Sequence, residues 1–157
     1  MSGIAFARMD LTHLLSAVEL EKECFSLPWS AEMFLAELND PHCVYFAAEE
    51  DGRLIGYAGM QYVLDEGYIN NIAVSPSYRR RGVASALMDR LIDSARGLSL
   101  AFLTLEVRCG NHAAISLYEK YGFERVGLRR GYYEKPREDA LLMTLFFGRD
   151  ASDREEA

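Results

Sequence analysis

Seven short stretches of the chain are rich in β-branched and aromatic residues or alternate hydrophobic with polar positions, as β-strands do. They are residues 4–9, 43–49, 54–63, 68–74, 102–107, 123–128 and 141–147. Asp51-Gly52 separates the second stretch from the third and favours a hairpin, because both residues tolerate positive φ. A second turn at residues 65–67 then predicts an antiparallel meander of three strands.

Four longer stretches repeat hydrophobic residues with the 3.6-residue period of an amphipathic helix. Asp10 is the predicted N-cap of the first, over residues 11–25, and Ser30 caps the second, which ends at residues 39–41. The third helix follows Gly82 and ends at Gly97. The fourth begins at the Asn111 cap and ends at residues 121–122. We expect the first two helices to cover one edge of the sheet.

The order of these elements predicts a mixed sheet. The strand–helix–strand unit over residues 68–107 favours one parallel pairing within an otherwise antiparallel sheet. The expected class is α+β, or α/β in looser usage, with about seven strands and about four helices. A chain of 157 residues is long enough for one core and short for two. We expect a single domain over residues 1–149, followed by a frayed acidic tail over residues 150–157.

Charge and composition narrow the possible partners. The net charge of −7 opposes binding to nucleic-acid phosphates and suits a basic peptide or an amine better. The three cysteines are scattered, which indicates reduced thiols, and Cys109 with His112 lacks a second ligand pair, so no metal is expected. Neither a secretory signal nor a membrane-spanning run is evident, so we expect a cytoplasmic protein without membrane contact.

Residues 70–87 carry the first chemical signal. The apolar strand Ile72-Ala73-Val74 runs into a Ser-Pro turn, three arginines and Gly82, which opens a helix. A helix that starts at such a turn presents unpaired backbone N–H groups and the positive end of its dipole, which suit a phosphate. Gly82 would allow close approach and Ala84 would keep the first helical turn small. The alternative is a basic surface turn whose glycine satisfies local geometry alone.

The segment from Arg79 to Ala84 resembles the Arg/Gln-x-x-Gly-x-Gly/Ala acetyl-CoA motif of the GNAT superfamily of N-acetyltransferases. Many relatives have glycine where this chain has Ala84, but the motif allows alanine. The order of elements resembles the GNAT fold over nearly the whole chain. Further segments are similar to the RimI family within that superfamily: Phe-Ser-Leu-Pro-Trp-Ser (25–30), Asn-Ile-Ala-Val (71–74), Leu-Glu-Val-Arg (105–108), and residues 111–115, 117–123 and 130–133.

This resemblance implies acetyl-CoA as co-substrate and places its contacts. The backbone of residues 72–74 (Ile72, Ala73, Val74) would pair with the pantetheine arm like another strand. The backbone amides of residues 80–85 would hold the diphosphate; these are Arg80, Arg81, Gly82, Val83, Ala84 and Ser85. Asn111 would contact the cofactor from the next helix, although a simple N-cap explains it equally well.

Glu106 is the candidate general base. An α-ammonium, with a pKa of about 8, must lose a proton before it attacks a thioester, and a carboxylate acting directly or through water can take it. Glu106 lies on the opposite face of its strand from Leu105 and Val107. The alternative role for Glu106 is a surface ion pair with Arg108. The match to the Leu-Glu-Val-Arg segment of the RimI family favours the catalytic role.

Tyr118 is the candidate general acid, because a phenol can protonate the CoA thiolate that leaves. Aromatic packing on an amphipathic helix is its alternative, and Tyr121 is a rival that reads better as packing. Trp29, Tyr132 and Tyr133 are expected to flank the entrance for a peptide, although aromatic packing explains them at least as well. No serine or cysteine arrangement calls for a covalent intermediate, so we expect direct transfer.

Taken together, these features favour a RimI-like enzyme that moves acetyl from acetyl-CoA to the α-amino group of an N-terminal alanine. The resemblance implies small-subunit ribosomal protein number eighteen, or another Ala-starting peptide, as the acceptor. Two alternatives stay open: a GNAT enzyme that acts on a small amine or a lysine, and a non-catalytic acyl-CoA-binding regulator.

Overall fold

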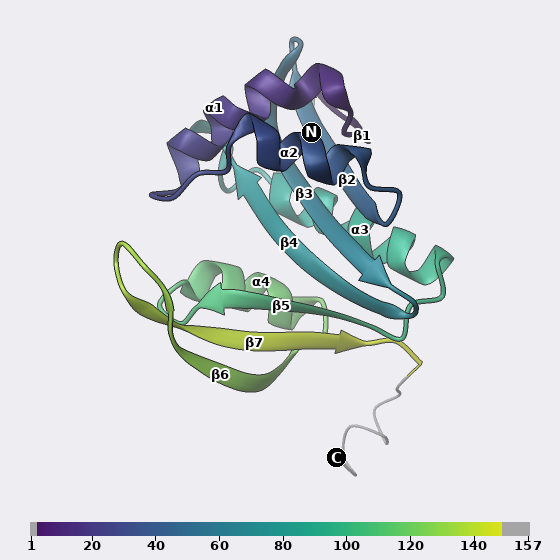
Figure 1. Ribbon diagram of the computed structural model, residues 1–157, viewed down its shortest axis with the longest axis vertical. Coiled ribbons are helices and arrows are strands. Elements are labelled where there is room, and N and C mark those ends of the chain that lie inside the picture. Colours follow the sequence, from purple (N-terminus) through teal and green to yellow (C-terminus); the bar gives the residue numbers. More distant parts are fainter. Residues whose placement is uncertain (1–2, 149–157) are drawn as a thin grey trace. The chain divides into compact units, whose positions relative to one another are not determined.

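A computed structural model describes residues 3–148 of the chain, so the predicted tail over residues 150–157 lies outside the described residues. Residues 3–148 form a sheet with the strand order β1-β2-β3-β4-β5-β7-β6 (Figure 1). The strands are β1 (Ile4–Arg8), β2 (Cys43–Glu50), β3 (Arg53–Val63), β4 (Glu66–Val74), β5 (Phe102–Arg108), β6 (Glu124–Tyr133) and β7 (Glu138–Phe146). The helices are η1 (Leu11–His13), α1 (Leu14–Cys24), α2 (Ala31–Asn39), η2 (Pro76–Tyr78), α3 (Val83–Gly97) and α4 (His112–Lys120). The predicted fold class is confirmed.

The chain folds as two compact units. The first consists of Met1–Tyr62 and Ile69–Ser94, and the second of Val63–Tyr68 and Ala95–Ala157. The assignment of residues 1–149 to one domain stays a prediction. None of the helices in residues 3–148 combines the length and the apolar character that crossing a membrane requires.

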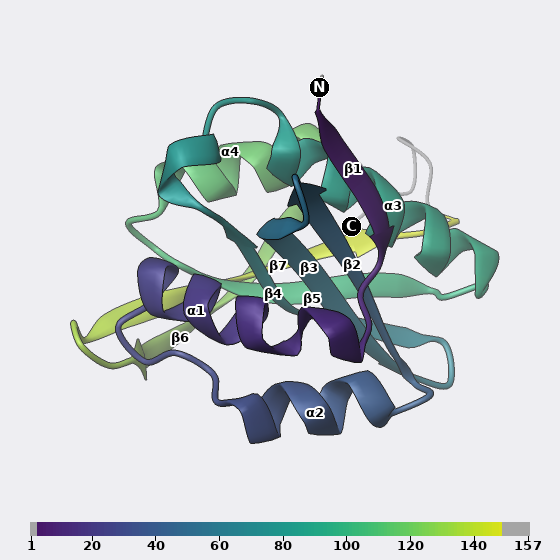
Figure 2. The ribbon, with the colours of Figure 1, turned by 90° about the horizontal axis from the view of Figure 1, so that it is seen from above.

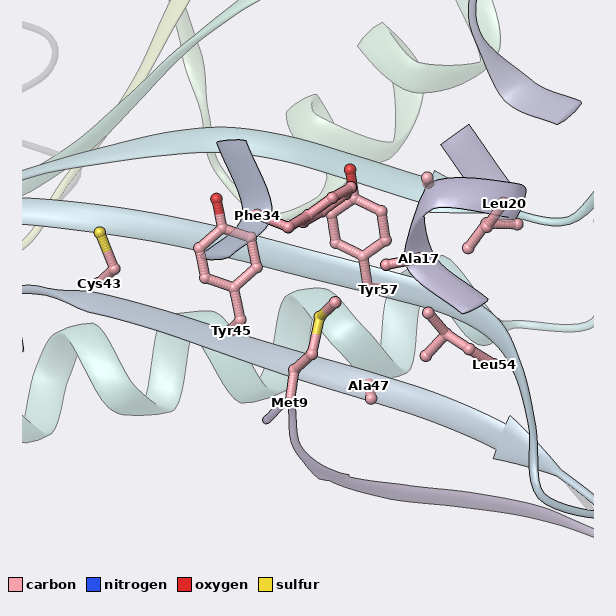
Figure 3. Close-up of a cluster of buried hydrophobic side chains, with 10 residues drawn as sticks. Met9, Ala17, Leu20, Phe34, Cys43, Tyr45, Ala47, Leu54 and Tyr57 are labelled. Carbon is pink, nitrogen blue, oxygen red and sulfur yellow. The ribbon is translucent and has the colours of Figure 1, made fainter. Parts of the chain in front are cut away.

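In the first unit, α1 and α2 lie side by side against the sheet (Figure 2). Beneath them is a cluster of buried side chains, most of which are labelled in Figure 3: Met9, Ala17, Leu20, Phe34, Cys43, Tyr45, Ala47, Leu54, Tyr57 and Ala73. Because Tyr45 and Ala47 alternate along β2 and both belong to this cluster, the two helices cover a face of the sheet and not its edge.

The opposite face of the same strands meets α3. Gly56 neighbours Tyr57 in β3, so the two residues face opposite ways. A Cβ atom at Gly56 would lie 3.2 Å from Val83 Cγ1 and 3.5 Å from Leu87 Cδ1, both on α3. Glycine therefore allows the first turns of α3 to approach the strand closely.

In the second unit, β4 pairs with β5 in parallel, with Tyr68 opposite Thr104. β5 pairs with β7, and β7 with β6, both antiparallel. The burial of β5 alternates strictly, with Leu103, Leu105 and Val107 in the core. The single parallel pairing predicted from the strand–helix–strand unit is thus confirmed, and Glu106 stands on the face of β5 opposite these core residues.

Three strand ends differ from the predicted ones by two residues or more. β4 begins at Glu66, two residues before the predicted start, because the turn is confined to residues 64–65, where Leu64 takes a φ of +55°. β6 continues to Tyr133, beyond the predicted end at residue 128, and β7 begins at Glu138. This extension contains an irregularity, with Gly131 at a φ of +62° and its amide bonded to the Asp139 carboxylate. Such a glycine interrupts the alternation by which strands are recognised in a sequence.

Candidate active site

The turn between β4 and α3 lies in the first unit and has the geometry expected of an anion site. Arg80 and Gly82 both adopt positive φ, +64° and +78°, and a Cβ atom added to Gly82 would meet no other atom within 4 Å. The Ala86 amide donates to the Gly82 carbonyl at 3.0 Å. The amides of Val83 and Ala84 therefore lie ahead of the first hydrogen bond of the helix, where the dipole favours a negative charge.

Two of the three arginines in this turn contact groups of the protein itself. Arg79 Nε donates to the Val74 carbonyl at 3.3 Å. The Arg81 guanidinium lies 5.0 Å from the centre of the Tyr78 ring, in a cation–π contact. Arg79 and Arg81 are therefore partly held by the turn itself.

In the strand segment from Ile72 to Val74, two backbone groups already have hydrogen-bond partners within the protein, which limits the predicted pairing with pantetheine. The Ile72 amide donates to Asn71 Oδ1 at 3.0 Å, and the Val74 carbonyl accepts from Cys24 Sγ at 3.4 Å. The Ala73 side chain is buried in the cluster under α1 and α2. Pairing of this segment with a cofactor stays a prediction, and it would have to use the other backbone groups.

Glu106 lies in the second unit, and its side chain is only 6% exposed. The Tyr68 hydroxyl, on the neighbouring parallel strand, donates to Glu106 Oε2. Arg129 Nε lies 3.5 Å from Oε1. A buried carboxylate is costly unless it is paired, and here a cation and a phenol compensate it.

Arg108, the predicted alternative partner of Glu106, contacts other residues instead. Arg108 Nη1 lies 3.3 Å from Glu138 Oε1, and the guanidinium also donates to the carbonyls of Glu134 and Pro136. Arg108 thus holds the hairpin between β6 and β7. Its ring contact is with Tyr133, 4.4 Å from the guanidinium carbon to the ring centre.

Tyr132 joins the group around Glu106. Its pKa is raised by burial and also by a hydrogen bond with Glu106, while Tyr68 lowers it. Burial and the Glu106 carboxylate together raise the pKa of Tyr68 too. The Tyr132 ring meets Tyr133 edge to face at 5.0 Å. The structure therefore places Glu106 with two phenols and one arginine.

Tyr118 lies on α4 in the second unit and is buried, with its ring 5.7 Å from that of Phe123. Burial raises its pKa to about 12, so the phenol stays protonated across the physiological range. Burial is also the largest cause of the raised pKa of Tyr133. A protonated phenol is the form that a general acid requires.

Asn111 caps α4, since its side chain accepts from the Ala114 amide at 3.2 Å. That local role is confirmed, and its contact with a cofactor stays a prediction. Trp29 lies in the first unit, where its ring packs 5.3 Å from Phe34 and its amide donates to Glu21 Oε1 at 2.9 Å. Packing is thus the observed role of Trp29, and its contact with a peptide stays a prediction.

Tyr68 and Arg129 were not predicted from the sequence as partners of Glu106. Tyr68 is two residues before Asn70 in β4, and its distance from Glu106 is set by the register that pairs it with Thr104. Arg129 lies on β6, on the far side of β7 from Glu106. The general signal was a lone carboxylate on a strand face, which predicts a partner on a neighbouring strand without saying which residue supplies it.

With this geometry in view, comparison with known proteins gives the class. Residues 14–123 match the acetyltransferase (GNAT) family, and the chain belongs to that family. It is 39% identical over 139 residues to the [ribosomal protein bS18]-alanine N-acetyltransferase of Escherichia coli K12, which covers 87% of this chain and 93% of the relative. It is 40% identical over 141 residues to the N-alpha-acetyltransferase RimI of Mycobacterium tuberculosis, covering 86% and 85%.

Solved structures of similar proteins agree with this family assignment. The ribosomal-protein-S18-alanine N-acetyltransferase of Escherichia coli superposes with a TM-score of 0.86 and 36% identity, over 96% of this chain and 97% of that one. Arabidopsis thaliana NAA60, solved with a bisubstrate analogue, has a TM-score of 0.82 and 25% identity, over 91% and 97%. The predicted GNAT fold and the resemblance to the RimI family are confirmed.

Proposed function

We propose that this chain transfers the acetyl group of acetyl-CoA to the α-amino group of an N-terminal alanine, with ribosomal protein bS18 as its acceptor. The observation that carries the proposal is the 39% identity to the E. coli bS18-alanine N-acetyltransferase over 87% of this chain. The likeness spans 93% of that relative, so no large part of it lacks a counterpart here. An acceptor on a ribosomal protein implies a cytoplasmic place of action.

The donor would bind along β4 and the start of α3. The open space at Gly82 and the amides of Val83 and Ala84 suit the diphosphate, which needs close approach to the backbone. Arg80 and Arg81 would add positive charge at the same turn. The pantetheine arm would lie beside residues 72–74. Asn111 stays a proposed contact of the cofactor, through its side-chain amide nitrogen, since its oxygen caps α4.

Glu106 would remove the proton that blocks attack. The α-ammonium of the acceptor loses a proton to the carboxylate, directly or through one water, and becomes a nucleophilic amine. Arg129 and Tyr68 contact the two oxygens of this carboxylate and hold it in one orientation. A base must be ionised to accept the proton.

Transfer then proceeds directly. The amine nitrogen forms a bond to the thioester carbonyl carbon, giving a tetrahedral intermediate, and the C–S bond breaks as this intermediate collapses. The electron pair leaves on sulfur, and the Tyr118 phenol supplies the proton that converts the CoA thiolate to a thiol. Burial raises the pKa of Tyr118 to about 12, so the phenol carries its proton at neutral pH. Trp29, Tyr132 and Tyr133 would border the path of the acceptor peptide.

The test is mass spectrometry of peptides incubated with acetyl-CoA and the enzyme. One Ala-starting peptide has a free amino terminus and an internal lysine; its partner has the same sequence with the terminus blocked. We expect a single acetyl group on the α-amine of the first and none on the second. Acetylation of lysine in the blocked peptide would instead identify a lysine acetyltransferase. Acetylation of neither, with acetyl-CoA bound, would overturn the proposal in favour of an enzyme for small amines or a regulator.

A further inference from the structure

Two adjacent asparagines on β4, Asn70 and Asn71, are not used by the proposed function. Each donates to a tyrosine of the sheet, on β3 for Asn71 and on β2 for Asn70, and to a glutamate on a covering helix. The two sets, all within the first unit, have the same chemistry: Glu21, Tyr57 and Asn71 form one, which we name the Glu21 triad, and Glu37, Tyr45 and Asn70 form the other, the Glu37 triad.

The Glu21 triad is buried. Glu21 on α1 is 1% exposed and Tyr57 on β3 is fully buried. Tyr57 donates its hydroxyl to Glu21 Oε2, and Asn71 Nδ2 donates to the same oxygen at 3.0 Å and to the Tyr57 hydroxyl at 2.9 Å. Burial raises the pKa of Glu21, and the bonds from Tyr57 and the Trp29 amide oppose that rise. An acidic group this deep is retained at a cost, which points to a role beyond packing.

Two backbone contacts distinguish this triad. Glu21 Oε1 accepts from the Trp29 amide at 2.9 Å, which ties the loop between α1 and α2 to the last turn of α1. Asn71 Oδ1 accepts from the Ile72 amide at 3.0 Å, at the start of the segment proposed to line the acetyl-CoA arm. One carboxylate therefore links the loop proposed for the acceptor to the strand proposed for the donor.

The Glu37 triad lacks both links. Tyr45 donates to Glu37 Oε1 at 3.1 Å, and Asn70 Nδ2 donates to the same oxygen at 2.6 Å. The other carboxylate oxygen accepts from Cys43 Sγ at 3.2 Å, and burial together with Glu37 raises the pKa of that thiol to about 12. Tyr45 and Tyr57 stack at 6.2 Å with their hydroxyls pointing the same way (Figure 3), so they form a matched pair.

We propose that Glu21 is a positioning residue, which holds the Trp29 loop in register with the Asn71–Ile72 backbone and thereby sets the affinity for the acceptor peptide. The proposal rests on the proposed function. Glu21 touches neither reacting group, and it acts through the Trp29 amide. Because Trp29 is the only tryptophan of the chain, its fluorescence reports on this loop alone.

The experiment compares Tyr57→Phe and Glu21→Gln with Tyr45→Phe in the full chain. Each tyrosine variant loses one hydroxyl bond to a glutamate, and the bond of Tyr57 is the more buried of the two. Both melting temperatures should therefore fall, that of Tyr57→Phe at least as far as that of Tyr45→Phe. Only Tyr57→Phe and Glu21→Gln should raise the KM for an Ala-starting peptide, by about tenfold, which corresponds to ~1.4 kcal/mol. In these two variants kcat and the KM for acetyl-CoA should stay within about twofold of wild type.

Acrylamide quenching of Trp29 provides a readout that needs no catalysis. Quenching should increase in Tyr57→Phe and Glu21→Gln and stay at the wild-type level in Tyr45→Phe. If Tyr45→Phe matches Tyr57→Phe in both KM and quenching, Glu21 has only a structural role and the inference is wrong. If the wild-type chain acetylates no peptide, the proposed function fails, and the quenching comparison still decides whether Glu21 positions the loop.

Discussion

Tyr68 donates its hydroxyl hydrogen bond to the carboxylate of Glu106 from the adjacent parallel strand. Arg129 approaches the other oxygen of that carboxylate, at 3.5 Å. Both contacts lie inside the second unit and rest on backbone pairing, with Tyr68 opposite Thr104 and Glu106 two residues further along β5. The base proposed for the reaction is thus oriented by rigid strands and not by a loop.

Removing the Tyr68 hydroxyl should impair catalysis without preventing folding. For Tyr68→Phe we expect kcat/KM to fall about tenfold, because a hydrogen bond to a charged group is worth ~1.5–3 kcal/mol and Arg129 still holds the carboxylate. Steady-state kinetics with an Ala-starting peptide would measure the change. Tyr62→Phe is the control, since that ring packs against His42, and it should stay close to wild type. Equal activities of Tyr68→Phe and wild type would show that the bond does not serve catalysis.

Glu106→Gln should lower kcat/KM by about 10²-fold near neutral pH, the loss typical of a missing general base. The defect should shrink as the pH rises past about 8, where the α-amine of the acceptor loses its proton to solvent. The measurement is kcat/KM for wild type and variant across the pH range in which both stay folded. A defect of constant size at every pH would assign Glu106 to orientation and not to proton removal.

Tyr118→Phe should keep the fold and bind acetyl-CoA, yet reduce kcat by about 10²-fold, since the CoA thiolate would leave without a proton donor. Because Tyr118 has a pKa of about 12, wild type should show no loss of kcat from its ionisation below about pH 11. Single-turnover measurements separate this chemical step from product release. Tyr121→Phe serves as the comparison, and a larger defect there would move the acid to that residue.

The same burial predicts how stability depends on pH. In the folded chain the Tyr118 phenol keeps its proton up to about pH 12, while in the unfolded chain it loses it from pH 10. The folded state therefore binds more protons in this interval, and its stability falls as the pH rises from 10 to 12. Denaturant unfolding should show the stability advantage of wild type over Tyr118→Phe shrinking there by about 2–3 kcal/mol. A difference independent of pH would contradict the raised pKa.

Gly82→Ala should weaken acetyl-CoA binding. Its φ of +78° is strained for alanine by roughly 1 kcal/mol, although no atom obstructs the new methyl group. The methyl would also occupy the space proposed for the diphosphate, so we expect the KM for acetyl-CoA to rise and the peptide KM to stay near wild type. Gly97→Ala is a matched control, since its φ is ordinary and its surroundings are equally open. That variant should be as stable as wild type or slightly more so.

Most elements of this fold could be predicted because their signals are local. Asp51 and Gly52 both take positive φ in their hairpin, and Ser30 and Asn111 cap the helices that follow them. These roles depend on a few neighbouring residues. The end of β6 could not be predicted, since the pairing of Tyr133 with Glu138 continues past an irregularity that breaks the alternation.

In the candidate site, too, the features with local signals could be predicted and those that depend on strand pairing could not. The open turn at Gly82 is a local property of the chain, and the motif predicts it. The partners of Glu106 come from strands remote in sequence, and the residue two positions away, Arg108, binds Glu138 instead. Choosing between Arg108 and Arg129 requires the register of three strands, which hydrophobic patterns leave undetermined.

The buried thiol of Cys43 has a practical consequence for following acetyl transfer. With a pKa of about 12, roughly one molecule in 10⁵ carries a thiolate there at pH 7, and thiolates are the species that attack disulfide reagents. Burial raises the pKa of Cys24 as well. A colour-forming disulfide reagent should therefore read the thiol of released CoA against little background from these two positions, so that turnover can be recorded continuously on the native chain.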